Sequence, residues 1–224
     1  MIKHHPKHEL LAAFVAGELP AALNIAISAH VELCDECQQA ITLLTQAKAD
    51  EVFSIEDESV FNNVEVDLDD DFEDLMIAQI TSQKGDYVDE EPTVCTVEYA
   101  GKQVNLPRAL NSVNWAKFQG VGKLSRARLD LDEGTVRSYL LQIGAGGSVP
   151  MHTHKGYEVT VLLDGSFEDE MCSYSKGDFI WLDQSFTHSP VSNDGCLCLT
   201  VADDAPVFTQ GLSKLLNPIG RFIY

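Results

Sequence analysis

Histidine and cysteine gather in two clusters whose spacing suits metal binding. The chain has 224 residues with seven His and six Cys. Imidazole and thiolate groups are the usual protein ligands of zinc and related metals. Every histidine falls in one cluster or the other: His4, His5, His8 and His30 with Cys34 and Cys37, then His152, His154 and His188 with Glu158. The sequence therefore predicts two metal sites in different parts of the chain.

The first cluster has the spacing His30-x3-Cys34-x2-Cys37. On a helix, residues four apart share a face, so His30 and Cys34 lie together and Cys37 follows after a tight turn. A fourth ligand must come from elsewhere, and the histidines at positions 4, 5 and 8 are the candidates. Two imidazoles and two thiolates form a closed tetrahedral set that suits structural zinc. A free cysteine pair is one alternative. A redox pair is disfavoured because the pattern around it is helical.

The second cluster reads His152-x-His154-x3-Glu158, with His188 farther along. Alternate side chains of a strand point the same way, so the first two histidines can converge on one ion, with the other two ligands on neighbouring strands. The set could hold zinc, manganese, iron, nickel or copper. The alternative is a set of hydrogen-bonded core residues, but buried imidazoles are costly unless they are liganded or hydrogen-bonded.

The elements that must position these residues change in character along the chain. Apolar residues recur at helical spacing in the N-terminal third, and Gly17 is placed to cap the first helix. Beyond about residue 99, short β-branched runs separated by turn residues indicate strands, and Asp164-Gly165 between two runs predicts a hairpin turn. The predicted helices span residues 8–15, 20–33, 36–48 and 69–82, and the predicted strands span residues 136–143, 157–163, 179–182 and 196–202.

The predicted helix at 69–82 has an apolar stripe opposite acidic residues, which suits either core packing or an apolar face offered to a partner. The stripe consists of Phe72, Leu75, Met76, Gln79 and Ile80.

The net charge of −20 is unevenly distributed. Residues 50–91 contain sixteen acids and one base, Lys84, a local charge of −15. Phosphate binding depends largely on Lys and Arg, so this charge argues against direct binding to nucleic acid or to an anionic membrane and favours a basic protein partner. A solvated linker is the alternative for this acidic stretch.

We expect a cytoplasmic protein, because no apolar run reaches the roughly 18 residues of a membrane span and the N-terminus lacks signal-peptide features. In that reducing compartment we expect no disulfides.

Each of the two clusters lies in a motif that resembles one of a known family. The order of His4-His5, the segment Ala-Ala-Phe-Val-Ala-Gly and His30-Val-Glu-Leu-Cys34-Asp-Glu-Cys37 resembles the zinc-binding anti-sigma domain of the ChrR-type anti-sigma factors. The second cluster, with Gly146, Gly165 and Gly177 around it, resembles the two metal motifs of the cupin fold, although Asp183 and Ser185 replace the usual proline and glycine.

This resemblance implies an α + β two-domain protein, with a small all-α zinc-binding domain followed by an all-β cupin (double-stranded β-helix). The domains are expected at residues 1–84 and 99–224, joined by an acidic hinge at 85–98. The implied zinc ligands are His5, His30, Cys34 and Cys37, with His4 as the rival of His5 and His8 as a solvated residue. The implied cupin ligands are His152, His154, Glu158 and His188. The metal expected there is a divalent ion, with zinc as the first choice and manganese, iron or nickel as the others.

The same resemblance implies the function. An extracytoplasmic-function sigma factor is the expected partner, held away from RNA polymerase until a stress such as singlet oxygen or organic peroxide releases it, with the cupin taking part in the response. A metal-dependent cupin enzyme, of dioxygenase or isomerase type, is the alternative. The sequence shows no clear general acid or base for it, because Glu158 is taken up by the metal and the orientation of Asp183 and Glu170 is not known from sequence. A metal-stabilised adaptor for another partner is a third class. The sequence leaves open a homodimer without partner and the roles of Cys95, Cys172, Cys196 and Cys198.

Overall fold

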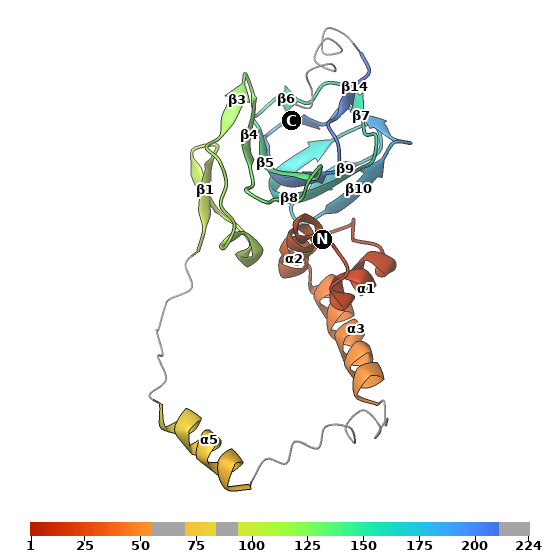
Figure 1. Cartoon of the computed structure of the whole chain (residues 1–224). Helices are drawn as coiled ribbons and strands as arrows, with labels where there is room; N and C mark the ends of the chain where they lie inside the picture. The colour runs from red at the N-terminus through yellow and green to blue at the C-terminus, as the bar shows by residue number, and fades with distance from the viewer. Residues whose placement is uncertain (55–69, 84–93, 211–224) are drawn as a thin grey trace. The chain divides into compact units, whose positions relative to one another are not determined.

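The computed structural model describes residues 1–54, 70–83 and 94–210 (Figure 1). It divides into two compact units, of which the first combines Met1–Gln46 with Val94–Tyr224 and the second is Ala47–Thr93. Most of the acidic stretch, and the predicted hinge as far as residue 93, lie outside the described residues. The predicted boundaries at 84 and 99 stay a prediction.

Helices occupy the N-terminal third, as the apolar periodicity predicts. They are α1 (His8–Ala16), α2 (Ala21–Leu33), α3 (Asp35–Phe53) and α5 (Asp70–Ser82). Gly17 ends α1 with a φ of 72°, and its N–H and that of Glu18 bond to the carbonyls of Phe14 and Ala13. This left-handed cap is the one that glycine adopts without strain, so the first helix ends where the sequence predicts.

Antiparallel strands build the rest of the first unit, and we call residues 94–210 the β-region. A nine-stranded sheet has the order β3-β4-β5-β13-β8-β12-β6, with β9 and β10 also paired to β8, beside a three-stranded sheet β11-β7-β14 and the pair β1-β2. The strands are β1 (Thr96–Tyr99), β2 (Lys102–Asn105), β3 (Gln119–Val121), β4 (Leu124–Arg128), β5 (Arg137–Ile143), β6 (Gly147–Ser148), β7 (His152–Thr153), β8 (Tyr157–Glu168), β9 (Ser173–Ser175), β10 (Phe179–Asp183), β11 (Thr187–His188), β12 (Val191–Ser192), β13 (Cys196–Ala202) and β14 (Val207–Phe208). The α + β fold class and the four predicted strands are confirmed.

The predicted hairpin at Asp164-Gly165 is wrong. These residues lie inside β8, which continues to Glu168; they pair with Leu197 and Cys196 of β13, and the residues after them pair with β9. The pairing shifts by one residue between Leu197 and Cys198, which identifies a β-bulge. Gly165 has a φ of 77°, and a Cβ there would collide with the carbonyl oxygen of Gly195. The Asp-Gly pair therefore follows a bulge within a long strand and does not reverse the chain.

Helix α2 is docked on the β-region along its length. It packs against β8 and β13 and against the short 3-10 helix η1 (Arg108–Leu110). The Glu133 carboxylate accepts hydrogen bonds from the first backbone N–H groups of α2, at 2.9 Å from Ala22 N, and the Glu32 carboxylate accepts one from Arg108 N at 2.8 Å. Buried residues of α2 share one apolar cluster with Val159, Leu197 and other β-region residues. Helix and sheet thus bury one common core.

Among the described residues, no single helix is long and apolar enough to cross a membrane. Taken together, α1 and α2 have the length and apolar composition of a membrane span, but the two helices are bent by 115° at their junction.

The common core predicts that damage in α2 is felt by the β-region. Ile27 is fully buried, so Ile27→Ala should lower the free energy of unfolding by about 2–5 kcal/mol. Both tryptophans, Trp115 and Trp181, lie in the β-region, so their fluorescence during urea unfolding reports on the sheet. We expect their transition to shift to lower urea in the variant. The matched control is Leu43→Ala on α3, where the side chain is 68% exposed and the change should stay within about 0.5 kcal/mol. An unmoved tryptophan transition in Ile27→Ala would contradict a shared core.

Two candidate metal sites

The four residues expected to hold zinc meet at the junction of α2, α3 and the N-terminal segment. The Nε2 atom of His30 lies 3.2 Å from Cys37 Sγ, and His5 Nδ1 lies 3.4 Å from the Sγ atoms of both Cys34 and Cys37. A zinc ion with Zn–S near 2.3 Å and Zn–N near 2.0 Å has ligand–ligand edges of about 3.3–3.8 Å. The donor atoms therefore already have nearly the spacing that tetrahedral zinc requires.

The local sequence explains how the two cysteines converge. Cys34 ends α2 in an extended conformation, with φ −127° and ψ 103°, so the chain turns sharply before α3 begins at Asp35. Cys37 then faces back toward His30 from the first turn of α3. This is the tight turn that the spacing predicts.

The three N-terminal histidines have different surroundings. His5 joins the cluster, and Glu36 Oε2 lies 3.7 Å from its second ring nitrogen. The ring of His4 instead packs on Tyr174, with 4.8 Å between centroids. His8 is exposed at the start of α1. The geometry favours His5 over His4 as the fourth ligand.

Burial favours the neutral forms of His30 and Cys37. Desolvation lowers the pKa of His30 to about 4, although its hydrogen bond to the Gly177 carbonyl acts in the opposite direction. Desolvation, followed by the neighbouring Cys34, raises the pKa of Cys37 to about 12. A neutral imidazole presents the lone pair that a metal needs, whereas the thiol must lose its proton when the metal binds.

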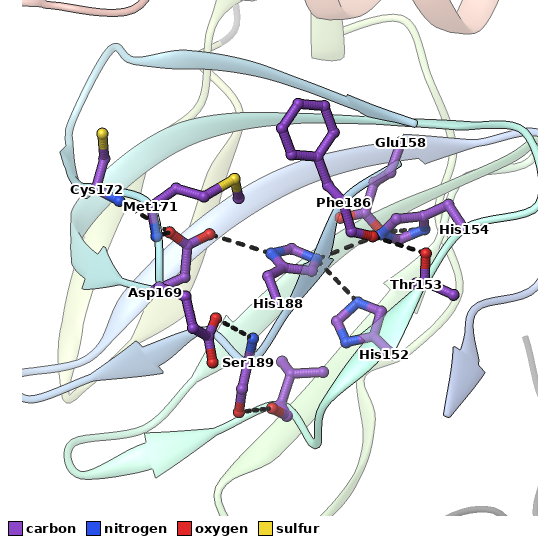
Figure 2. A network of polar contacts seen from close by, with 12 residues as sticks. His152, Thr153, His154, Glu158, Asp169, Met171, Cys172, Phe186, His188 and Ser189 are labelled. Carbon is purple, nitrogen blue, oxygen red and sulfur yellow. Dashed lines mark hydrogen bonds and ion pairs between the residues drawn. The ribbon is translucent and has the colours of Figure 1, made fainter. Parts of the chain in front are cut away.

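The second cluster brings together all four of its expected residues (Figure 2). His152 and His188 are directly opposite each other on β7 and β11, and Glu158 comes from β8. The Nε2 atom of His188 lies 3.1 Å from that of His152 and 3.3 Å from that of His154. Glu158 Oε2 lies 3.8 Å from His154 Nδ1. Three ring nitrogens and a carboxylate thus surround one point.

The tautomers of these histidines are set from outside the cluster. His152 Nδ1 donates to the carbonyl of Pro150 at 2.8 Å, and His188 Nδ1 lies 3.2 Å from Asp169 Oδ2. Because the protons sit on Nδ1, both Nε2 atoms direct lone pairs at each other. Lone pairs that face each other at 3.1 Å repel unless a proton or a metal ion lies between them. A hydrogen-bond partner on the other ring nitrogen is typical of metal-bound histidine.

Desolvation also dominates the electrostatics of the second cluster. It lowers the pKa of His152 to about 4 and that of His154 to about 3, and it raises that of Glu158 to about 7. His154 Nδ1 is buried without a hydrogen-bond partner in the described part of the chain. A divalent cation would offset the cost of burying the carboxylate and use the converging lone pairs, so the residues fit a metal ion.

Sequence reasoning missed the outer partners of both clusters. Asp169 holds His188, and the Gly177 carbonyl holds His30 at 2.7 Å from Nδ1. Neither has a spacing signal, because each reaches its histidine only through the fold.

The acids considered for catalysis have structural roles. Glu170 Oε2 accepts a hydrogen bond from Ser189 N at 2.9 Å, and Asp183 Oδ1 accepts one from Ser185 N at 2.9 Å. The second contact closes the turn in which proline and glycine are replaced.

All six cysteines are free thiols. Cys196 and Cys198 are buried in β13 with their Sγ atoms 3.8 Å apart, whereas Cys172 is exposed beside Asp169 and Cys95 is half-buried. The placement of Cys196 and Cys198 is that of small core residues.

Comparison with known proteins extends these findings over the whole chain. Family models match a ChrR cupin-like domain at residues 107–205 and a putative zinc-finger at residues 8–38. The anti-sigma-E factor ChrR of Cereibacter sphaeroides is 31% identical over 228 residues, covering 98% of this chain and 99% of that protein. The crystal structure of Rhodobacter sphaeroides SigE in complex with the anti-sigma ChrR matches with a TM-score of 0.61 and 29% identity, over 90% of this chain and 100% of that one. The chain therefore belongs to the ChrR family of anti-sigma factors.

Proposed function

We propose that this protein binds an extracytoplasmic-function sigma factor, keeps it from RNA polymerase, and releases it under stress. The observation that carries the proposal is the similarity over nearly the whole chain to an anti-sigma factor, together with the match to a structure in which such a protein is bound to its sigma factor. The test is co-expression with the sigma factor encoded beside it. We expect the two proteins to copurify in a one-to-one complex that blocks transcription from the sigma-dependent promoter.

Helix α5 has the surface that such a partner needs. Its apolar side chains are exposed, from 45% for Met76 to 69% for Leu75, so the alternative of core packing is not realised in the described residues. Exposed acids on the same helix, Glu73 and Asp74, suit a basic partner. An amphipathic helix of this kind binds by burying its stripe in an apolar groove, while its charges speed the encounter.

The first cluster is proposed to hold structural zinc through His5, His30, Cys34 and Cys37. A closed set of four protein ligands leaves no position for substrate, so the metal fixes α2, α3 and the N-terminal segment relative to one another. The second is proposed to hold a divalent metal, zinc first and otherwise manganese, iron or nickel, through His152, His154, Glu158 and His188. We infer that this second site takes part in the stress response.

A metal-dependent cupin enzyme is the second candidate, favoured only by the ligand set of the second site. The three histidines are 3–4% exposed, and Glu170 and Asp183 both accept hydrogen bonds from backbone N–H groups. Family membership supports a regulator over an enzyme. Turnover of a small substrate by the intact protein would favour the enzyme.

Loss of one zinc ligand should disable the regulator. Cys37→Ser should remove one zinc equivalent and weaken zinc binding more than 100-fold. Even the loss of a residue that only hydrogen-bonds to a ligand lowers metal affinity about 10–100-fold. Sigma-factor binding should be lost with the zinc. Zinc content by metal analysis and binding by calorimetry check both results. Cys172→Ser, an exposed thiol outside the cluster, is the control. Sigma binding of wild-type strength in zinc-depleted Cys37→Ser would refute a structural role for the metal.

The stripe of α5 should contribute directly to the interface. Leu75→Asp should weaken sigma-factor binding by at least about 2 kcal/mol, roughly 30-fold, because a buried interface anchor is replaced by a charge. The fold should be unaffected since this side chain is exposed. Thr81→Ala, on the opposite face of the helix, should bind as the wild type does. Equal dissociation constants for the two variants would show that the stripe does not contact the sigma factor.

The second site should affect release more than binding. With zinc in excess, His154→Ala should empty the second site, leave sigma-factor affinity within about threefold, and change the release of the sigma factor under at least one oxidant. His8→Ala, an exposed histidine outside both clusters, is the control. Release that matches the wild type under singlet oxygen and under organic peroxide would remove the second site from the response.

A further inference from the structure

One side of the first metal cluster is formed by the β-region. His30 is fully buried, and while its Nε2 faces Cys37, its Nδ1 donates to the carbonyl of Gly177 at 2.7 Å. Because a carbonyl can only accept, this bond places the proton on Nδ1 and leaves Nε2 free as a metal ligand. Gly177 lies in the turn between β9 and β10. The β-region thus sets the tautomer and the ring orientation of a zinc ligand on α2.

The next residue of that turn fixes the N-terminal segment. Asp178 is fully buried, and its Oδ1 accepts hydrogen bonds from Lys3 N at 2.7 Å and His4 N at 3.0 Å. Its Oδ2 accepts one from Ser175 N at 2.8 Å, and Phe179 N donates to the His4 carbonyl at 2.9 Å. Burial alone would raise the pKa of Asp178, but these backbone donors lower it, so the carboxylate stays charged. The segment that positions His5 is therefore held by an ionised group of the β-region.

The same stretch of chain reaches the second site at its other end. Asp169 accepts the contact from His188 Nδ1, and its Oδ1 also accepts hydrogen bonds from the backbone N–H groups of Met171 and Cys172 at 2.9 and 3.1 Å (Figure 2). Tyr174 follows in β9, is buried, and packs against His4. Residues 169–178, which we call the connecting segment, therefore contact a ligand of the second site at one end and a ligand of the first at the other.

We propose that the connecting segment couples the two metal sites energetically, with Asp169 and Asp178 as positioning residues at its ends. The proposal rests on the two sites of the proposed function and adds that their metals affect each other. Displacement of Asp169 when the second site loses its metal shifts the turn at Gly177 and Asp178, and zinc at the first site is then held less tightly. By linkage, zinc at the first site strengthens metal binding at the second.

Zinc release from the intact, zinc-loaded protein to a chromophoric chelator tests the coupling. Two release phases are expected, and Cys37→Ser and His154→Ala assign them because each removes one phase. Emptying the second site with His154→Ala should speed release from the first site about tenfold, within the range of about 5–150-fold that is typical of coupled sites. Asp178→Asn, which keeps the shape of the side chain but removes its charge, should also speed that release by about 10–100-fold.

The double variant distinguishes coupling from general loosening. If Asp178 carries the coupling, adding His154→Ala to Asp178→Asn should speed release much less than tenfold, because the pathway is already broken. Asp194→Asn, an exposed acid in another turn of the β-region, is the matched control and should release both metals as the wild type does. Far-UV circular dichroism should show the same secondary structure in all folded variants.

Three results would overturn the coupling. They are an unchanged first-site release rate in His154→Ala, an effect of His154→Ala that is fully additive with Asp178→Asn, or a first-site release rate in Asp178→Asn equal to that of Asp194→Asn. If the wild-type protein showed no zinc-release phase that Cys37→Ser removes, the first zinc site itself would be refuted. The first three outcomes leave that site and the sigma-factor proposal intact, so the two failures are distinguishable.

Discussion

The buried imidazole of His30 is the point on which the arrangement of the first unit depends. A fully buried ring must have both nitrogens satisfied, and one faces Cys37 while the other bonds to Gly177. Those two partners belong to α3 and to the β-region, so a single side chain on α2 links three parts of the chain. The apolar face of α2 then adds buried area to an orientation that these polar contacts fix. Hydrophobic burial is non-directional, whereas the histidine fixes how the helix is oriented on the sheet.

Local patterns predicted the helices, four of the strands and the residues that gather in the two candidate metal clusters. The first helix ended at a residue with a local reason to stop, Gly17, and most candidate ligands lay in short motifs with a fixed spacing. His5 was instead chosen by the family resemblance, and His188 lies thirty residues beyond its motif. The hairpin prediction failed at Gly165 because an Asp-Gly pair can also stand within a strand next to a bulge, and here it pairs with Leu197 and Cys196 of β13. Asp169 and Asp178 could not be predicted, since each meets its histidine only after distant strands have paired.

The relation between the helices and the β-region was the hardest feature to predict. Composition showed an acidic, base-poor stretch and suggested separate domains, but it could not show where α2 would bury its face. One signal was present: along Ala21–Leu33 only Asn24, Ser28, His30 and Glu32 are polar, so the apolar surface is wider than one stripe. A helix of this kind is buried on more than one side. The contacts of α2 with α1, β8 and β13 follow from that composition.

This common core changes how a signal can act on a bound partner. If helices and β-region were joined only by a flexible linker, a change at the second site could alter their local concentration but not the conformation of the zinc cluster. The α2 helix, the N-terminal segment and the connecting segment share hydrogen bonds and a core. A structural change around His188 can therefore alter the free energy of the contacts that hold His30. A stress signal releases a partner only when the signalled state binds it more weakly than the resting state does. The contacts through Gly177 and Asp178 are a physical means by which that difference can arise.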